Sequence, residues 1–336
     1  MIQWGLAGLG DISRKRVAPA IRSQSDSILS AVHSPFEAEL RKFQSDFIVE
    51  KAYLCYEDML SDPDVHAVYI ATPIHLHAGL ALKAIESGKH VLVEKPMAMK
   101  NAECEAMIAA AHRNGVKLGV SYYRRFFPKL IEAKRLINEG AIGDVVGARI
   151  YFHSWYNPAP DDPKYWRVIK MKGGGGPLWD IGCHKIDQMM DLLGDVKSVC
   201  AYMRTLTHDY EVEDSCSAIL EFTSGVCCEM GFRWNCKTWA DEFVVLGTDG
   251  KIDMTPGDSD IIELELPPGR MRGMGKELTT VSKPPASNVH APLVDDFAKA
   301  VIENREPRIN GEAGYRVNSV LAAIEESSVT GNRIII

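Results

Sequence analysis

The sequence has no run of about 18 apolar residues of the kind that crosses a membrane, and no cationic segment precedes its first apolar stretch. It has no block of five or six basic residues, and its net charge of −7 is opposite to that of a typical nucleic-acid binder. None of its eight cysteines forms a CxxC pair or a zinc-like spacing. We therefore expect a soluble cytoplasmic protein with reduced core thiols that acts on a small molecule, without nucleic-acid or membrane partners.

Apolar residues are plentiful, because 46% of the 336 residues are hydrophobic, which is enough for two packed cores. We expect two domains, 1–123 and 124–336, with one division near Tyr123. In the first, strand-like apolar runs alternate with segments of helical spacing, the pattern of a parallel sheet covered by helices on both faces. The expected strands are 2–7, 27–33, 51–55, 65–71, 90–93 and 117–120, and the expected helices are 11–22, 36–46, 75–87 and 101–114.

After a predicted helix over 127–139 the pattern changes to consecutive strands, which favours an antiparallel sheet. The expected strands are 148–156, 196–206, 216–222, 226–234 and 242–246. Helical spacing is also present over 179–193, 291–303 and 313–329. Two glycine-rich turns, 173–176 and 267–275, are expected to be mobile.

A glycine turn, GLAGLGDIS, follows the first strand and opens a helix. Gly8 and Gly10 occupy the first two positions of a GxGxxG fingerprint, and Ser13 replaces the third glycine. Such glycines let backbone N–H groups approach a pyrophosphate at the positive end of a helix. By itself the motif is equally consistent with a plain strand-to-helix turn, but its place in the first strand–helix junction favours a dinucleotide site.

The nucleotide is expected to be NAD(P), with NADP favoured. The second strand ends at His33 and Ser34 without the acidic residue that binds the ribose of NAD. Three basic residues follow the glycines, Arg14, Lys15 and Arg16, and could tolerate a 2′-phosphate. The alternative is that they lie on a solvated helix face.

Three residues are candidates for proton handling and substrate contact. Lys95 follows the fifth strand, at the edge where open α/β sheets bind ligands, and Pro96 restricts its backbone. Asp180 and His184 are four residues apart in the predicted helix, so both lie on one face. An imidazole has a pKa suited to general base catalysis, and the carboxylate could orient it. Alternatively, Asp180 caps the helix, Lys95 lies in water and His184 packs against a core.

A metal is the competing idea, because four possible ligands are present. Their spacing fits no zinc signature, and we expect no metal. These ligands are His75, His77, Cys183 and His184.

Together, the motifs resemble the Gfo/Idh/MocA oxidoreductase family, named for glucose–fructose oxidoreductase and inositol dehydrogenase. The resemblance covers nearly the whole chain. It rests on the glycine turn, AVYIATPIHLHAGLALKAIESGKHVLVEKPMAM, YYRRFFP, GGGGPLWDIGCHKID and the terminal EESSVTGN. It implies an α/β Rossmann domain followed by an α+β domain on an open, mostly antiparallel sheet, which often builds a homo-dimer or homo-tetramer.

The resemblance also implies roles for individual residues. Lys95, Asp180 and His184 take the catalytic positions, and the Lys95–Pro96 bond is expected to be cis. The expected cofactor contacts are Gly8, Gly10, Asp11, Ile12, His33, Ser34, Thr72, Pro73, His77, Glu94 and Lys95. The expected substrate contacts are Lys95, Tyr122, Arg124 (or Arg125), Tyr156, Trp166, Arg167, Asp180 and His184, with Trp155 and His290 as weaker candidates. Departures from the family pattern are Ser13, the acid-free end of the second strand, and Phe127.

The expected function is NAD(P)-dependent hydride transfer at a secondary alcohol or ketone of a sugar, polyol or related cyclic substrate. Two alternatives stay open. In one, a tightly bound nucleotide cycles while a sugar is oxidised transiently to allow a bond to be eliminated. In the other, the chain is a nucleotide-sensing protein that kept the fold and lost the chemistry.

Overall fold

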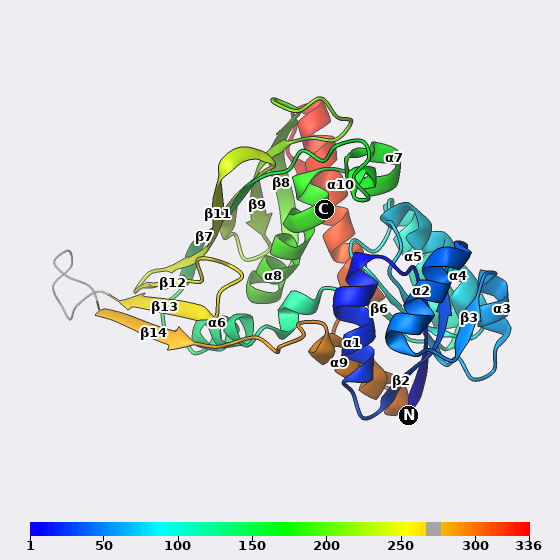
Figure 1. Ribbon diagram of the computed structural model, residues 1–336. Coiled ribbons are helices and arrows are strands. Elements are labelled where there is room, and N and C mark those ends of the chain that lie inside the picture. Colours follow the sequence, from blue (N-terminus) through cyan, green and yellow to red (C-terminus); the bar gives the residue numbers. More distant parts are fainter. Residues whose placement is uncertain (267–276) are drawn as a thin grey trace. The chain divides into compact units, whose positions relative to one another are not determined.

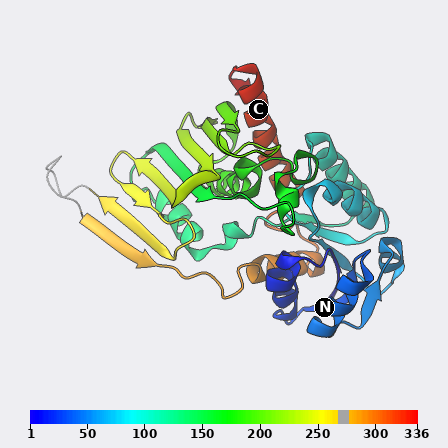
Figure 2. The same ribbon diagram turned by 45° about the horizontal axis from the view of Figure 1, so that its top comes forward.

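The computed structural model describes residues 1–266 and 277–336, and the chain folds into two compact units (Figures 1 and 2). The first contains 1–123 and 286–318, and the second contains 124–285 and 319–336. The glycine-rich turn expected over 267–275 lies outside the described residues. Among the described residues, no helix is both long enough and apolar enough to span a membrane.

The first unit is built on a six-stranded parallel sheet in the order β3-β2-β1-β4-β5-β6. The central strands are buried on both faces, which is why they are nearly all apolar in sequence. The order reverses between β1 and β4, and such a switch point is where doubly wound folds bind their ligands. The strands are β1 (Ile2–Ala7), β2 (Ser27–His33), β3 (Lys51–Tyr53), β4 (Ala67–Ile70), β5 (His90–Val93) and β6 (Leu118–Val120).

Helices cover both faces of this sheet, as the alternating pattern predicted (Figure 1). On one face α1 neighbours α9, and on the other α4 neighbours α5. The helix after the glycine turn contains a π-helical segment, η1. A short helix missed in the sequence, α3, buries Tyr56, Met59 and Leu60. The helices are η1 (Ser13–Val17), α1 (Ala18–Arg22), α2 (Glu37–Phe47), α3 (Tyr56–Ser61), η2 (Ile74–Leu76), α4 (His77–Glu86), α5 (Asn101–Asn114) and α9 (Ala291–Ile302).

The expectation that the chain divides once needs correction, because 286–318 returns to the first unit. Phe297 on α9 packs 5.5 Å from Trp4, measured between ring centroids. A Cβ at Gly119 would come within 2.8 Å of the same phenylalanine ring, so the glycine makes room for it. Asn318 also donates to the Ala98 carbonyl at 2.7 Å. Apolar burial against β1 and β6 thus recruits a segment distant in sequence.

The second unit contains a nine-stranded sheet in the order β14-β13-β12-β11-β7-β10-β9-β8-β15. It is mostly antiparallel, as expected, but β7 and β10 pair in parallel because the chain crosses the sheet between them. The strands are β7 (Val145–Trp155), β8 (Val196–Arg204), β9 (Ser215–Phe222), β10 (Cys227–Arg233), β11 (Asn235–Gly247), β12 (Lys251–Asp253), β13 (Ile261–Leu266), β14 (Glu277–Ser282) and β15 (Ile334–Ile335).

Helices cover one face of this second sheet and leave the other open (Figure 2). Facing the helices are apolar residues such as Ile150 and Phe243, and on the open face Tyr202, Ile219 and Leu246 are exposed. The helices are α6 (Pro128–Asn138), η4 (Tyr165–Val168), α7 (Lys170–Gly173), η5 (Leu178–Gly182), α8 (Cys183–Leu193) and the latter part of α10 (Gly311–Thr330), while η3 (Tyr123–Phe126) spans the boundary between the units.

The glycine run at 173–176 is packed rather than mobile. A Cβ at Gly175 would lie 2.2 Å from the Trp179 ring, and one at Gly176 would lie 1.8 Å from the carbonyl oxygen of Glu213. Only glycine allows these close approaches, so the run joins α7 to η5 by a tight path. The cysteines are all unpaired, but only four are buried, and Cys55, Cys200 and Cys227 are exposed rather than core thiols.

Candidate functional site

The glycine turn lies at the switch point between β1 and β4. Gly8 has φ of +87°, and a Cβ there would meet the Ala71 carbonyl oxygen at 2.8 Å. Its N–H donates to the His33 carbonyl at 3.2 Å, which joins the turn to the end of β2. The Ser13 hydroxyl donates to the Gly8 carbonyl at 2.6 Å, so the residue that replaces the third glycine closes the turn. The departure at Ser13 thus leaves the cradle intact.

The turn offers the features that a dinucleotide pyrophosphate requires. A Cβ built at Gly10 meets nothing within 4 Å, so this part of the backbone faces open space. Thr72, which follows β4 at the same edge of the sheet, has a buried hydroxyl with no hydrogen-bond partner in the described part of the chain. Backbone N–H groups at a helix start and an uncommitted hydroxyl are suitable partners for phosphate or ribose oxygens. The residues present therefore fit NAD(P).

The end of β2 itself has no acid, as predicted, but a carboxylate from the following helix lies one hydrogen bond away. Glu39, from the first turn of α2, accepts a 2.5 Å hydrogen bond from the Ser34 hydroxyl. Two of the three basic residues after the glycines have carboxylate partners: Arg14 pairs with Asp46 at 2.5 Å, and Lys15 pairs with Asp11 at 3.0 Å. Glu39 was not predicted from the sequence, because it lies on the following helix and not at the strand end.

At the end of β5, Glu94 lies in a buried polar network and Lys95 follows it, half buried. The Lys95–Pro96 bond is cis, as the resemblance implied. Tyr69 donates to Glu94 at 2.7 Å, and His290 Nε2 lies 3.5 Å from the same carboxylate oxygen. Burial alone would raise the pKa of Glu94, but His290, Tyr69 and Lys95 together hold that pKa below its ordinary value. The Glu94 carboxylate thus stays negatively charged next to Lys95.

His77 connects two loops at this edge. Its Nδ1 lies 3.0 Å from the Pro96 carbonyl oxygen, and its Nε2 lies 2.9 Å from that of Thr72. The ring is buried, and burial lowers the pKa of His77. His33, with its Nδ1 3.0 Å from the Tyr53 carbonyl, is also engaged with backbone. Both histidines were expected at the cofactor, and the structure gives each a positioning contact.

In the second unit, Asp180 lies on η5 and His184 on the first turn of α8. The expected helix over 179–193 thus begins with a π-helical segment, a variation frequent at functional sites. Asp180 Oδ2 lies 3.3 Å from Arg167 NH1, and both side chains are about one third exposed. His184 is only 4% exposed. The structure therefore adds a guanidinium to the pair recognised in the sequence.

Aromatic side chains adjoin this guanidinium. The Arg167 Cζ lies 5.6 Å from the centre of the Trp166 ring. Burial raises the pKa of Tyr156, and Asp180 adds to this, while Arg167 opposes it, so these three groups share one electrostatic environment. The ring centroids of Tyr156 and Trp234 lie 4.6 Å apart. Four predicted substrate residues, Tyr156, Trp166, Arg167 and Asp180, are thus brought together within the second unit.

The arginines after the domain boundary pair with carboxylates. Arg124 bonds to Asp258 through two nitrogens, and Arg125 Nε donates to Asp187 at 2.8 Å. Arg124, or Arg125, was expected to contact substrate, and the structure pairs each guanidinium with a carboxylate. Tyr122 is fully buried in the first unit.

Glu213 is a residue that the sequence analysis missed. Its carboxyl accepts hydrogen bonds from Gly176 N–H at 2.8 Å and Leu178 N–H at 3.3 Å, directly before Asp180. Burial raises the pKa of Glu213 to about 7. No sequence signal connects a glutamate before β9 with a turn 37 residues earlier.

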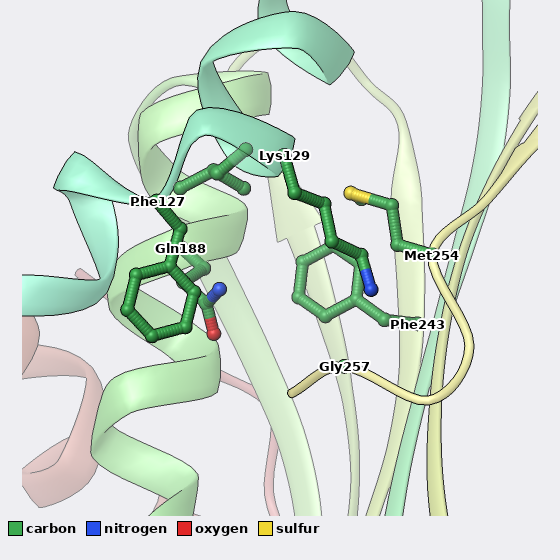
Figure 3. Close-up of a pocket in the computed structure, with 7 residues that line it drawn as sticks. Phe127, Lys129, Gln188, Phe243, Met254 and Gly257 are labelled. Carbon is green, nitrogen blue, oxygen red and sulfur yellow. The ribbon is translucent and has the colours of Figure 1, made fainter. Parts of the chain in front are cut away.

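Figure 3 shows a small cavity of the second unit, and a Cβ on its lining residue Gly257 would meet the buried ion pair of Lys185 and Asp241. Its lining is Phe127, Lys129, Leu130, Gln188, Phe243, Met254 and Gly257. Among the described residues, no group of three or more His, Cys, Asp or Glu side chains is placed to hold a metal ion.

Comparison with known proteins gives two family matches. Residues 2–122 match the oxidoreductase family with an NAD-binding Rossmann fold, and residues 130–253 match the GFO/IDH/MocA C-terminal domain. A 1,5-anhydro-D-fructose reductase from Ensifer adhaerens is 29% identical over 98% of this chain and 97% of its own. A trans-1,2-dihydrobenzene-1,2-diol dehydrogenase from Danio rerio is 30% identical over 75% of this chain and 73% of its own.

A solved structure of levoglucosan dehydrogenase in complex with NADH has the same fold. It is 25% identical, with a TM-score of 0.89, and the match covers 100% of this chain and 99% of that one.

Proposed function

Because the chain belongs to the Gfo/Idh/MocA oxidoreductase family, we propose that it interconverts a secondary alcohol and a ketone on a sugar, polyol or related cyclic substrate. It is an NAD(P)-dependent oxidoreductase of CH–OH groups. When bound, the nicotinamide supplies the hydride acceptor or donor. The glycine turn binds the pyrophosphate common to NAD and NADP, and so does not choose between them.

The observation that carries the proposal is the position of Lys95 at the same sheet edge as the Gly8 turn, with the buried Glu94 behind it. The ammonium group of Lys95 holds the substrate oxygen and stabilises negative charge on it. Because the role proposed for Lys95 is to hold the substrate oxygen, proton transfer is assigned to another group.

His184 is the group proposed to accept the hydroxyl proton during oxidation and to return it during reduction. In oxidation, the substrate O–H bond gives its proton to the imidazole, the C–H bond leaves with its electron pair as hydride, and the C=O bond forms. Asp180 on η5 and Arg167 on η4, paired at 3.3 Å, supply further polar groups. These can contact neighbouring substrate hydroxyls.

The substrate class follows from the aromatic and charged side chains of the second unit. Tyr156 and Trp166 provide apolar surface, and Arg167 and Asp180 provide a donor and an acceptor. Cyclic polyols and sugars have C–H faces that pack on aromatic rings and hydroxyls that need such polar partners. The reductase, diol dehydrogenase and levoglucosan dehydrogenase named above act on substrates with vicinal oxygen functions, which supports this class.

The test compares His184→Ala and Lys95→Ala with two surface controls, His112→Ala and Lys83→Ala. We expect each site variant to lower turnover at least ~10²-fold while nucleotide binding, measured by fluorescence titration, is retained. The controls remove exposed side chains of the same types and should keep normal turnover. Near-normal turnover in either site variant would refute the assigned roles.

The same assay separates the alternatives. Purified protein is screened against cyclic polyols, aldoses and keto-sugars with both nucleotides, and absorbance is read at 340 nm. Net hydride transfer changes this absorbance in proportion to product. Product without a net change would favour transient oxidation with a cycling nucleotide. Nucleotide binding with no turnover of any substrate would favour a sensor.

Self-association is proposed to use the open face of the second sheet. Tyr202, Ile219 and Leu246 expose apolar surface there, on strands whose opposite face is covered. Exposed apolar side chains on an uncovered sheet face are typical of an interface. Light scattering after gel filtration should show a dimer or tetramer that Ile219→Lys dissociates and that the helix-surface control Val329→Lys does not. A monomeric wild-type protein would contradict the proposal.

A further inference from the structure

We propose that Glu39 selects NAD(H) over NADP(H). The inference rests on the proposed function only in requiring that a dinucleotide binds at the Gly8 turn. It reverses the preference suggested by the sequence, where the end of β2 lacked an acid and three basic residues followed the glycines.

The position of Glu39 follows from two contacts. The Gly8 N–H donates to the His33 carbonyl at 3.2 Å, so the glycine turn and the end of β2 are adjacent. The next residue, Ser34, donates its hydroxyl to Glu39 Oε2 at 2.5 Å. A carboxylate is therefore fixed one hydrogen bond away from the end of β2, although it comes from the following helix.

The end of β2 is where a Rossmann fold recognises the adenosine ribose. An acidic residue accepts a hydrogen bond from the 2′-hydroxyl of NAD, and its charge opposes the 2′-phosphate of NADP. Glu39 is held by Ser34 on one oxygen and has a second oxygen available as an acceptor. Its side chain is partly exposed, so a ligand can reach it.

Two of the three basic residues that could have accepted a 2′-phosphate pair with carboxylates, while the third, Arg16, is exposed. Arg14 pairs with Asp46 at 2.5 Å, and its Cζ lies 4.9 Å from the centre of the Phe43 ring, so α2 holds it. Lys15 pairs with Asp11 at 3.0 Å on the exposed face of its own helix. A 2′-phosphate would have to compete with these carboxylates for Arg14 or Lys15.

A purely structural role for Glu39 makes different predictions. Glu39 is the third residue of α2, and the Ser34 hydroxyl also accepts the Phe36 N–H at 3.2 Å, so the carboxylate could simply support the helix start. Glu39→Gln keeps an acceptor oxygen for Ser34 and removes only the charge. If the role is structural, this variant changes stability without changing the ratio of the two nucleotide affinities.

The experiment measures equilibrium binding of NADH and NADPH to the full chain by nucleotide fluorescence, without substrate. We expect wild-type protein to bind NADH at least ~10-fold more tightly than NADPH, about 1.4 kcal/mol. Glu39→Gln should reduce that ratio at least ~10-fold, mainly through tighter NADPH binding. The matched control Glu37→Gln, two residues earlier on α2 and paired with Arg41, should leave the ratio unchanged.

Two outcomes would overturn the inference: tighter binding of NADPH by the wild-type protein, or an unchanged affinity ratio in Glu39→Gln. Because the readout is binding alone, it is independent of turnover. If the Lys95 and His184 variants kept normal turnover while Glu39→Gln changed the ratio of the two nucleotide affinities, the proposed chemistry would be refuted and the inference would stand. Binding of neither nucleotide would refute both.

Discussion

The carboxyl group of Glu213 accepts a 2.8 Å hydrogen bond from the backbone N–H of Gly176, at the end of the glycine run. The same carboxyl accepts Leu178 N–H, so it occupies the start of the helix that carries Asp180 and His184. A Cβ at Gly176 would strike the Glu213 backbone, which shows how closely the two segments pack. The glycines are therefore required for contact with a buried acid, and this contact fixes where the proposed proton-handling helix begins.

The stability of the protein is expected to depend on pH through Glu213. Burial raises the pKa of Glu213 from 4.5 to about 7. The folded state thus holds a proton that the unfolded state releases above pH ~4.5. The resulting stabilisation is fully present below that pH and is lost as pH rises through about 7, amounting to on the order of 3 kcal/mol.

The measurement is the free energy of unfolding by urea at several pH values between 5 and 8. Glu213→Gln cannot titrate and should flatten the fall in stability across this range. Glu211→Gln is the matched control, because Glu211 also accepts a backbone N–H, that of Lys170 at 2.9 Å, but is exposed. An equal pH dependence in Glu213→Gln and wild type would show that another group is responsible.

The buried ion pair between Lys185 and Asp241 should be strongly sensitive to removal of one partner. Both side chains are at most 1% exposed, and burial lowers the pKa of Lys185 while Asp241 opposes this. Asp241→Asn leaves an ammonium group without its counter-charge, and a cost of about 3–5 kcal/mol in unfolding free energy is expected.

Replacing both partners of the pair shows how much of the lost unfolding free energy comes from the unpaired buried charge and how much comes from altered packing. Lys185→Met with Asp241→Leu removes both charges and should recover most of the lost stability. As a control, Lys197→Met breaks an exposed pair with Glu221 and should cost less than about 1 kcal/mol. A double variant as unstable as Asp241→Asn alone would indicate that cavity or shape effects dominate.

Local signals made the first sheet and the glycine turn predictable. Each of its strands is a short apolar run. The contact that closes the glycine turn, from Ser13 to Gly8, joins residues only five positions apart. Contacts between distant segments were not predictable. Glu39 reaches the end of β2 from a helix, and Glu213 reaches Gly176 across 37 residues. The spacing of side chains along a strand or helix carries no information about such partners.

The same limit explains the errors in the second half of the chain. Consecutive strands favoured antiparallel pairing, but β10 lies beside β7 in parallel, with β8 and β9 placed beyond it. The segment 286–318 looked like a terminal part of the second domain, yet Phe297 packs on Trp4 of β1. Both arrangements are set by which buried surfaces fit together in three dimensions.

Two glycines of the turn should respond differently to the same substitution. Gly8 has φ of +87° and would place a Cβ 2.8 Å from the Ala71 carbonyl, so Gly8→Ala strains the backbone by roughly 1–2 kcal/mol and adds a clash. Gly10 has open space around its Cβ position, so Gly10→Ala should leave the unfolding free energy unchanged within about 0.5 kcal/mol. The unfolding free energy therefore separates Gly8, which the fold itself requires to be glycine, from Gly10, whose open space only a ligand would need.

Nucleotide binding completes the comparison, because the open space at Gly10 is where a pyrophosphate would approach the backbone. Gly10→Ala should weaken NADH binding at least ~10-fold in a protein of normal stability, as measured by fluorescence titration beside thermal unfolding. Gly8→Ala should lower both quantities. Gly79→Ala serves as a control, since a Cβ at this exposed helix position also meets nothing within 4 Å, far from the turn in sequence. If Gly10→Ala bound NADH normally, the open backbone at Gly10 would not be the approach path of the pyrophosphate, and the cradle would have to be formed by other N–H groups of the turn.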